Sequence, residues 1–334
     1  VAGECDWCEV SFGQGDSVVS FSVSPNMDTV DREYTYTFSC GEQSTGLTIF
    51  QFRGEPALND DEIIQFNDPN FLKAVLANGV DADGDGQISV GEAKDVTYLE
   101  LNTVTEDGYT TGYDITDLTE ISYFVNLEWL DCGSNLYEEL NLSDNRKLIY
   151  VIGIEGKVAE VDVSGCADLQ YLDLRWNQLT QLDVSSNSRL TDLLCDANEL
   201  SAIDVSNNPE LKTLTVAVNN LREIDLTNCT KLESLGCASN QISQLDLSSN
   251  PNLTWIQCGY NNLTELDVSE YEHMASLDCS GNQISRMDVS GILDLVEFWC
   301  SGNPFEELII AEAHRDASWY DGVYEEYADV IVVK

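Results

Sequence analysis

The 334-residue sequence predicts a right-handed, mainly β solenoid with few helices, preceded by a small β domain. Three observations lead to this prediction. The chain repeats itself every 21 residues from Leu127 onward, each repeat holds a short stretch of alternating apolar and polar residues, and each repeat ends in residues that favour turns. One repeat cannot bury its apolar side alone, so successive repeats must stack and place their strands in one parallel sheet.

Nine rows within residues 127–310 fit the formula LxxLxCxxNxLxxLDVSxNxx. Leucines at this spacing and period are the signature of a leucine-rich repeat. The rows resemble the 21-residue, cysteine-containing repeats of internalin-like bacterial surface proteins. The resemblance implies that the parallel sheet lines the concave face and that the protein is secreted or lies on the cell surface. The rows begin at Leu127, Leu148, Leu169, Leu190, Leu211, Leu232, Leu253, Met274 and Leu295.

Row position 9 holds Asn in every row except the second, which has Gly156. An Asn amide satisfies backbone groups at a turn that cannot pair within their own coil. We therefore interpret this column as structural. It comprises Asn135, Asn177, Asn198, Asn219, Asn240, Asn261, Asn282 and Asn303.

Row position 6 faces the interior and holds either Cys or one of Gly153, Leu174 and Val216, so Cys acts there as a small hydrophobe. Neighbouring Cβ atoms in adjacent strands lie about 4.8 Å apart, whereas a disulfide needs about 3.8 Å. We predict a ladder of free, buried thiols. The ladder comprises Cys132, Cys195, Cys237, Cys258, Cys279 and Cys300. A second structural column contains Cys166 and Cys229, together with Asn145, Asn187, Asn208 and Asn250.

An aspartate recurs every 21 residues, two places before a Ser or Thr. Stacked carboxylates repel one another unless backbone donors or cations satisfy them. Hydrogen bonds from the adjoining turn are one interpretation, and a row of bound cations is the other. The column comprises Asp162, Asp183, Asp204, Asp225, Asp246, Asp267 and Asp288.

Residues 81–92, DADGDGQISVGE, fit the calcium-loop pattern D-x-[DN]-x-[DN]-G-x5-E. The preceding NFLKAVLANGV carries apolar residues at helical spacing. Together they predict a structural Ca²⁺ site, with Gly86 at the sharp turn. The alternative is a loop that keeps this fold without affinity for calcium. The predicted ligands are Asp81, Asp83, Asp85, Gln87, Ser89 and Glu92.

The ends of a solenoid need caps, because the first and last coils otherwise expose apolar surface. We assign residues 55–95 as a helical N-terminal cap that resembles a dockerin-like or EF-hand-like unit, 96–126 as a lead-in repeat and 311–334 as a C-terminal cap. Residues 1–54 alternate as strands and resemble part of a BACON-type, immunoglobulin-like domain of Bacteroidetes surface proteins. Whether Cys5, Cys8 and Cys40 form a disulfide stays open.

The formal net charge of −45 limits the classes of partner. Few Lys and Arg residues are available to neutralise phosphates, so we expect no nucleic-acid binding. Cations and basic proteins are favoured, and the alternative is that the charge serves solubility alone. We expect a monomer without a transmembrane segment, since no run of about 18 apolar residues is present. His273 and His314 accompany no nucleophile motif, so we predict no enzyme.

The outward positions of the predicted concave sheet carry aromatic residues in three consecutive rows. Trp, Tyr and Arg are enriched at binding hot spots, although aromatic residues also pair well across strands without any ligand. We predict a concave binding face. It comprises Trp129, Tyr150, Tyr171, Asp173, Arg175, Trp176, Trp255 and Trp299.

Two functions fit such a face. The first is adhesion or interaction at the cell surface, with an extracellular protein of a host or neighbouring cell held on the concave sheet. The second is glycan binding, with sugars stacked on Trp129, Tyr150 and Tyr171. The breadth of the sheet favours a protein. A passive spacer is the third alternative, and the aromatic bias of the concave face disfavours it.

Overall fold

The computed structural model describes residues 8–11, 20–23, 32–40, 43–51, 59–104 and 110–334. The chain divides into two compact units, Val1–Glu62 and Ile63–Lys334. In the described part of the first unit, β1 pairs with β2 and β3 pairs with β4, both antiparallel. The disulfide question for Cys5, Cys8 and Cys40 falls outside the described side chains. The strands are β1 (Cys8–Ser11), β2 (Ser20–Val23), β3 (Arg32–Cys40) and β4 (Gln43–Gln51).

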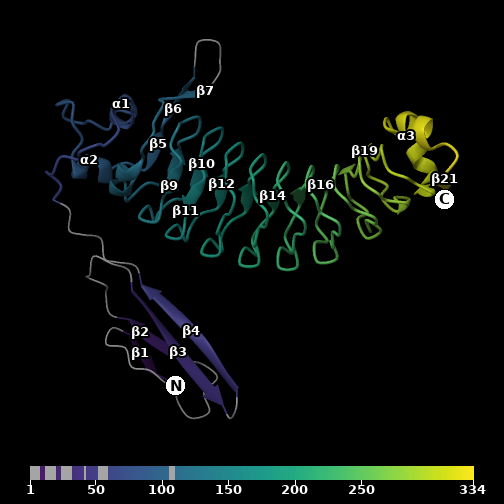
Figure 1. Cartoon of the computed structure of the whole chain (residues 1–334), viewed down its shortest axis with the longest axis horizontal. Helices are drawn as coiled ribbons and strands as arrows, with labels where there is room; N and C mark the ends of the chain where they lie inside the picture. The colour runs from purple at the N-terminus through teal and green to yellow at the C-terminus, as the bar shows by residue number, and fades with distance from the viewer. Residues whose placement is uncertain (1–7, 12–19, 24–31, 41–42, 52–58, 105–109) are drawn as a thin grey trace. The chain divides into compact units, whose positions relative to one another are not determined.

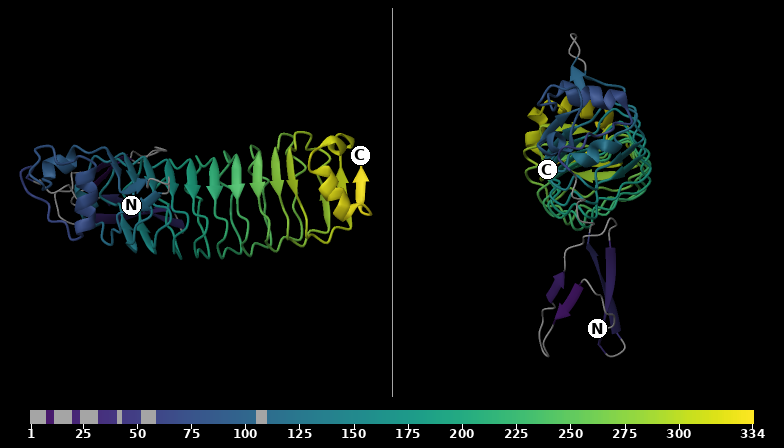
Figure 2. Two further views of the ribbon diagram at one scale, coloured as in Figure 1. Left: turned by 90° about the horizontal axis from the view of Figure 1, so that it is seen from above. Right: turned by 90° about the vertical axis from the view of Figure 1, so that its left-hand side faces the viewer.

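The second unit is a curved stack of coils (Figure 1), and its strands lie side by side in one ten-stranded sheet (Figure 2, left). All the pairs in this sheet are parallel, and each row position faces the same row position of the next coil. The predicted parallel-sheet solenoid is therefore confirmed. The strands are β5 (Tyr98–Glu100), β8 (Trp129–Asp131), β10 (Tyr150–Ile152), β12 (Tyr171–Asp173), β13 (Asp192–Leu194), β14 (Thr213–Thr215), β15 (Ser234–Gly236), β16 (Trp255–Gln257), β17 (Ser276–Asp278) and β19 (Glu297–Trp299).

Short elements complete the coils and both ends of this unit. The parallel pairs β9–β11 and β18–β20–β21 lie outside the main sheet, and β6 and β7 form a hairpin. These strands are β6 (Asn102–Val104), β7 (Thr110–Gly112), β9 (Glu139–Asn141), β11 (Glu160–Asp162), β18 (Arg286–Asp288), β20 (Glu307–Ile310) and β21 (Ile331–Val333). The helices are α1 (Pro69–Ala77), α2 (Val90–Lys94), α3 (Tyr320–Tyr327) and the 3₁₀ helices η1 (Thr119–Tyr123) and η2 (Glu312–Asp316).

Asp68 joins the N-terminal helix to the first coil. Its side chain accepts the N–H of Asn70 at 2.7 Å, which caps α1. Its other oxygen accepts the N–H and the hydroxyl of Thr116, at 2.6 and 2.8 Å. Although burial raises the pKa of this carboxyl, these hydrogen bonds outweigh it and lower the pKa. The same carboxylate therefore stabilises a helix end and the lead-in segment.

The interior of the coils is apolar apart from two ladders. Every cysteine of the row-position-6 column is buried and free, which confirms the predicted thiol ladder. Gly153 occupies one step of this ladder, where a Cβ would lie 3.3 Å from a methyl group of Leu174. Burial raises the pKa of Cys132 and Cys237 to about 12. The column therefore behaves as packing material and not as a reactive centre.

The asparagine ladder at row position 9 joins each coil to the one before it. Asn219 shows the repeated pattern: its amide nitrogen donates to the carbonyls of Cys195 at 2.9 Å and Val216 at 3.1 Å, and its oxygen accepts the N–H of Leu200 at 2.9 Å. The side chain is buried. Each such Asn therefore satisfies buried backbone groups of two coils, which confirms the structural interpretation.

Where this ladder lacks an Asn, a tyrosine hydroxyl takes its place. The second row has Gly156 in place of the Asn that would donate to the Cys132 carbonyl from the next coil. The hydroxyl of Tyr137 donates to this carbonyl at 2.9 Å instead. Among the described residues no coil follows the last strand, β19, and there the Tyr327 hydroxyl of α3 donates to the Cys300 carbonyl at 3.2 Å. Both tyrosines are buried in the coil interior. The two exceptions obey the same requirement for a donor.

Changing Tyr137 to Phe should lower the free energy of unfolding by about 0.5–1.5 kcal/mol, because the Cys132 carbonyl loses one of its two buried donors and keeps the Asn135 amide, while the ring volume is kept. Chemical denaturation of both proteins measures the difference. Tyr123→Phe is the matched control, because that ring is only half-buried. An equal, small effect at both positions would show that the Tyr137 hydroxyl is not needed.

The second ladder lies at row position 19. There the amide of Asn187 donates to the carbonyls of Val163 at 2.9 Å and Cys166 at 2.8 Å. Cys166 and Tyr271 occupy the same column and donate to the carbonyls of Leu142 at 3.2 Å and Leu247 at 2.5 Å. In the first seven rows this column therefore holds side chains that can donate a hydrogen bond into the preceding coil, and Cys does so through its thiol. The last two rows have Ile292 and Ala313 there.

Row position 8 turns the chain out of each strand with a left-handed backbone. Its φ lies between 54° and 59° at the non-glycine residues of this column and is positive at Gly281 and Gly302 as well. Large residues at this position are forced outward: Trp176 and Tyr260 are 63% and 65% exposed. Non-glycine residues rarely adopt this conformation. The solenoid tolerates this conformation because the N–H of the residue donates to a backbone carbonyl of the next coil. The Trp176 N–H, for example, donates to the Asp196 carbonyl at 2.9 Å.

The aspartate column is satisfied locally. Asp183, Asp204 and Asp225 each accept the N–H of the residue two places later at 2.9 Å, and the other members follow the same pattern. Hydrogen bonds from the Ser or Thr hydroxyl and N–H lower the pKa of these three carboxyls. The turn therefore accounts for the column, as the first of the two interpretations predicts.

Candidate binding face and calcium loop

Four aromatic rings stack in a row along the N-terminal part of the sheet. Tyr98 and Trp129 are 4.1 Å apart between ring centroids, Trp129 and Tyr150 are 6.2 Å apart, and Tyr150 and Tyr171 are 4.0 Å apart. The angles between neighbouring ring planes are 8°, 10° and 5°. The in-register strands β5, β8, β10 and β12 produce this arrangement, because row position 3 repeats at every step. The four residues are called the aromatic stack below.

The rings of the stack present their edges, and not their faces, to the space above the sheet. The Tyr98–Trp129 and Tyr150–Tyr171 pairs, at about 4 Å, cover one face of each ring, and the Trp129 and Tyr150 rings lie 6.2 Å apart. Ring edges carry partial positive charge and the tyrosines add hydroxyl groups, so the surface favours hydrogen-bond acceptors. Trp129, Tyr150 and Tyr171 are half-buried, whereas Tyr98 is 53% exposed.

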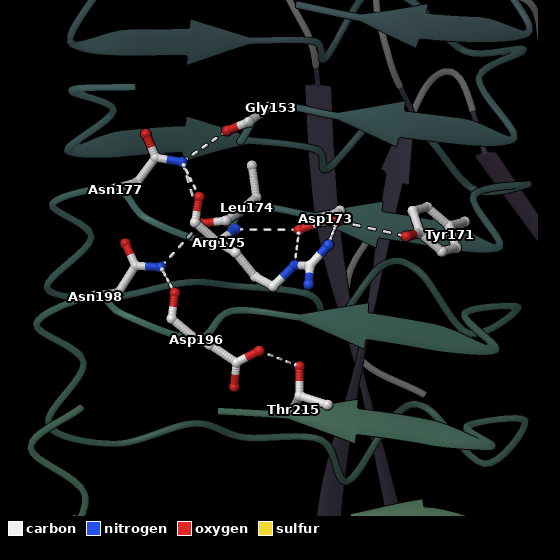
Figure 3. A network of polar contacts seen from close by, with 9 residues as sticks. All are labelled: Gly153, Tyr171, Asp173, Leu174, Arg175, Asn177, Asp196, Asn198 and Thr215. Atoms are coloured by element: carbon white, nitrogen blue, oxygen red, sulfur yellow. Dashed lines mark hydrogen bonds and ion pairs between the residues drawn. The ribbon is translucent and has the colours of Figure 1, made fainter. Parts of the chain in front are cut away.

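An ion pair borders the stack at Tyr171 (Figure 3). The guanidinium of Arg175 donates to both oxygens of Asp173, through Nε at 2.9 Å and through an Nη at 2.7 Å. This bidentate bond and the nearby acidic groups raise the pKa of Arg175, so it stays charged. The Tyr171 hydroxyl lies 3.4 Å from the same carboxylate. Arg175 remains 38% exposed in its side chain and is available to a ligand.

Asp173 departs from the prediction that it faces a ligand. Its side chain is only 3% exposed, because Arg175 covers it. It therefore positions Arg175 and does not itself offer a contact surface. In the next coil, Asp196 accepts the Thr215 hydroxyl at 2.6 Å (Figure 3). It also accepts the Ala217 N–H at 2.7 Å. Burial raises the pKa of Asp196, and these hydrogen bonds only partly oppose that effect.

The other predicted residues of the face lie apart from the stack. Trp176 sits at the left-handed row position 8, after the strand has ended. Trp255 is on β16, separated from β12 by β13, β14 and β15, and lies beside Gly236. Trp299 is on the terminal strand β19 and is 47% exposed. The structure thus brings Trp129, Tyr150, Tyr171 and Arg175 together and leaves these three tryptophans elsewhere.

Tyr98 is a member of the stack that the sequence analysis misses. The signal is present, since YLEL at 98–101 repeats the YLDL of 171–174. The β6–β7 hairpin lengthens the coil between β5 and β8, so Tyr98 falls outside the 21-residue frame.

The predicted calcium loop, residues 81–92, follows α1 and ends in the first turn of α2. Oxygens of Asp81, Asp83 and Asp85 lie within 4.8 Å of one another. Gly86 has a φ of +83°, as the sharp turn requires. Glu92 reaches back across the loop: its two oxygens accept the N–H of Ala82 and the N–H of Ser89, both at 2.8 Å.

The loop is anchored to the cap through its apolar position. Ile88 is fully buried, and its carbonyl accepts the N–H of Ile64 at 2.9 Å. Ile63 and Ser89 form an antiparallel bridge. Acidic oxygens gathered around a glycine turn are the donor set that Ca²⁺ takes, so the residues present fit that ion. A Ca²⁺ ion here would be linked to the core of the cap through Ile88.

Both histidines have structural partners. The exposed His273 pairs with Asp294 at 2.9 Å, which raises its pKa. His314 is buried, with Nε2 2.8 Å from the carbonyl oxygen of Ile292. Within the described part of the chain, no helix is long and apolar enough to span a membrane.

No protein-family model matches the chain, and no curated protein sequence matches it. Solved structures do match. The functional domain of InlJ from Listeria monocytogenes, described as including a cysteine ladder, aligns with 75% of this chain and 64% of that chain, with a TM-score of 0.59 and 28% identity. The fold is a leucine-rich repeat solenoid. The chain spans less than two thirds of the length of the InlJ structure. Both proteins have a ladder of cysteines.

Two other leucine-rich repeat structures agree in fold. The ectodomain of the Arabidopsis thaliana receptor kinase GASSHO1/SCHENGEN3 aligns with 65% of this chain and 28% of that chain, with a TM-score of 0.53 and 20% identity. The APL1 leucine-rich repeat domain aligns with 66% of this chain and 59% of that chain, with a TM-score of 0.52 and 19% identity. At this identity the likeness concerns the fold alone.

Proposed function

We propose that the protein is a non-enzymatic, secreted or cell-surface binding protein that holds an extracellular protein against the aromatic stack and Arg175. The observation that carries the proposal is the row of four stacked rings beside an exposed, bidentately held guanidinium. Rigid aromatic residues next to Arg are the side chains that dominate protein-binding hot spots. Leucine-rich repeat solenoids present such groups on a broad concave sheet.

The arrangement of the rings favours a protein over a glycan. A sugar stacks on a ring face, and one face of Trp129 lies against Tyr98 while one face of Tyr150 lies against Tyr171. Ring edges, hydroxyl groups and Arg175 instead suit backbone carbonyls and side-chain acceptors of a protein. Away from Arg175 the strands carry Asp131, Asp278 and Glu297, so basic residues on the partner would complete the contact.

A variant with Trp129, Tyr150 and Tyr171 changed to Ala should bind its partner at least about tenfold more weakly, because hot-spot truncations cost about 2 kcal/mol or more. We would measure binding of the native chain to a panel of extracellular proteins and glycans, with Ca²⁺ present, and repeat each positive result with the variant. Tyr260→Ala is the matched control, since it removes an exposed aromatic ring away from the stack. Equal binding by the native chain and the triple variant would exclude the stack.

We propose further that loop 81–92 binds Ca²⁺ and stabilises the N-terminal cap. Adding Ca²⁺ should raise the thermal midpoint of the native chain, because an ion that binds only the folded state stabilises it. Glu92→Gln should reduce this shift, since the position expected to close the site loses its charge. Asp95→Asn, an exposed acid three residues later, should leave it unchanged. Calorimetry in Ca²⁺ and in chelator measures both effects, and identical midpoints for the native chain would rule out the site.

A further inference from the structure

Row position 8, called the turn column below, carries a large apolar side chain in every second coil from the third row to the seventh. Trp176, Val218 and Tyr260 are 63%, 54% and 65% exposed. The coils between them carry the small residues Ala197 and Ser239. The three large residues have a left-handed φ of 55° to 59°, which is unfavourable for bulky and β-branched side chains. Exposed apolar groups kept in an unfavourable conformation indicate a contact surface.

Backbone hydrogen bonds hold the turn column at the spacing of the sheet. The N–H groups of Trp176, Val218 and Tyr260 each donate to a carbonyl of the next coil, at 2.9, 2.8 and 2.7 Å. Chains paired in this way lie about 4.8 Å apart, so equivalent positions two coils apart are separated by about 9.6 Å. Ala197 and Ser239 have this separation, and each lies between two large side chains. These two positions are called the seats below.

Gly281 fixes the orientation of the ring beside the second seat. A Cβ built on Gly281 would lie 2.7, 3.0 and 3.3 Å from Cδ1, Cε1 and Cγ of Tyr260, so one face of the ring lies against the glycine. Gly281 belongs to the coil after Tyr260, and Ser239 belongs to the coil before it. The exposed face of the ring is therefore directed toward the seat at Ser239. Aromatic side chains held in this way are the surfaces on which proline-rich peptides dock.

Side-chain amides accompany the turn column at row position 10, two residues further along each coil. They are exposed and have no hydrogen-bond partner among the described residues. Each offers two N–H donors and a carbonyl oxygen. A polyproline II chain makes no internal hydrogen bonds, so its carbonyls need donors of this kind. The amides belong to Gln178, Asn220, Gln241, Asn262 and Gln283.

These two row positions are almost free of charge. Between the third and the eighth row, Glu199 is the one charged residue at positions 8 and 10, although the chain has 60 acidic side chains. Depletion of charged residues is a mark of the centre of a protein interface. The surface therefore suits a neutral segment of a partner.

The separation of the two seats selects among the regular conformations of a peptide. A polyproline II helix has three residues per turn and rises about 3.1 Å per residue, so residues i and i+3 share one face about 9.3 Å apart. Residues i and i+7 of an α-helix are about 10.5 Å apart, and residues i and i+2 of a strand about 6.7 Å. The polyproline II value agrees best with the roughly 9.6 Å between the seats.

We propose that the turn column binds a proline-rich segment of a partner protein as a polyproline II helix, with two prolines, three residues apart, on the seats at Ala197 and Ser239. The first proline lies between Trp176 and Val218, and the second lies between Val218 and the open face of Tyr260. The exposed amides donate to carbonyls of the segment. No two of the six prolines in this chain are three residues apart, so the segment comes from another protein. The proposal does not rest on the aromatic stack.

The test uses the full chain and two uncharged, blocked dodecapeptides of equal composition. The first repeats Pro-Ala-Gln four times, which places its prolines three residues apart. The second has its prolines two residues apart, which distributes them over all three faces of the helix. Calorimetry should show that the first peptide binds at least about tenfold more tightly, because it alone fills both seats. Equal affinities, or no binding of either peptide at millimolar concentration, would overturn the proposal.

Filling the seats distinguishes this mode from general adsorption to apolar surface. The double variant Ala197→Val and Ser239→Val places a residue that Val218 shows to be accepted in the turn column at both seats. It should bind the first peptide at least about tenfold more weakly, although it exposes more apolar surface, and circular dichroism checks that it folds. Tyr260→Ala should also bind more weakly, whereas Tyr324→Ala, which removes an exposed ring of α3, should not. Undiminished binding by the double variant would contradict the seats.

The turn column and the aromatic stack respond to different variants. The chain with Trp129, Tyr150 and Tyr171 changed to Ala should bind the first peptide like the native chain, whereas Tyr260→Ala should not. A protein held by the stack should show the reverse pattern, so failure of one site is distinguishable from failure of the other. Binding of the neutral sugar cellohexaose that Tyr260→Ala abolishes, without binding of either peptide, would assign the column to a glycan and overturn the proposal.

Discussion

Replacing Asn219 by Ala should lower the free energy of unfolding by about 2–5 kcal/mol, a large effect for a single substitution. The side chain donates to the carbonyls of Cys195 and Val216 and accepts the N–H of Leu200. All three partners lie in buried residues, so water cannot replace the lost bonds. The two carbonyls each keep one donor, Asn198 at 3.1 Å and Asn240 at 2.9 Å, whereas the Leu200 N–H is left without its acceptor. An unsatisfied buried group costs about 1–3 kcal/mol, and each lost bond to a carbonyl adds about 0.5–1.5 kcal/mol.

Asn220 provides a matched control one residue away. Its side chain is exposed, so Asn220→Ala should change stability by no more than about 0.5 kcal/mol. Denaturant unfolding of the native chain and the two variants measures both differences. A similar midpoint for Asn219→Ala and Asn220→Ala would mean that the ladder does not hold adjacent coils together, contrary to the hydrogen-bond geometry.

The period of the repeat explains why most of the fold could be predicted. A 21-residue row fixes which residues face inward, and one in-register row determines its neighbours. Cys237 and Asn219 could therefore be assigned to buried ladders without coordinates. The same reasoning placed Trp129, Tyr150 and Tyr171 side by side, and the ring stack confirms that they are neighbours.

What could not be predicted depends on contacts between different columns or on breaks in the period. Tyr137 compensates for Gly156 only because row position 11 of one coil lies beside position 9 of the next. The left-handed turn at row position 8 is concealed by residues such as Trp176 and Val218, which rarely adopt it. Tyr98 was hidden by the β6–β7 insertion. The burial of Asp173 depends on the conformation of the Arg175 side chain, which the repeat pattern does not show.

The eight thiols of the solenoid should be almost inert in the native protein and react together on unfolding. Burial raises the pKa of Cys132, Cys237 and Cys300 to about 12, and all eight are buried. At pH 8 a thiol with a pKa near 12 holds about 10³-fold less thiolate than an unfolded one with a pKa of about 8.5, and only the thiolate reacts. A variant with Cys5, Cys8 and Cys40 changed to Ser removes the remaining cysteines, and a chromogenic thiol reagent counts the rest. Rapid reaction of several thiols in the folded chain would contradict the ladder.

The same pKa values predict how stability depends on pH. Unfolded thiols ionise above about pH 8.5, whereas folded Cys237 stays protonated until about pH 12. The stabilisation is therefore fully present below about pH 8 and is lost as the pH rises toward 12, by up to about 1.4 kcal/mol per pH unit for each thiol. Cys237→Val keeps an apolar residue that Val216 shows to be accepted in this column, and removes one titrating group. Its free energy of unfolding should fall less steeply than that of the native chain between pH 8 and pH 10. Parallel slopes would show that the Cys237 thiol ionises equally in the folded and unfolded states. That result would contradict its buried position.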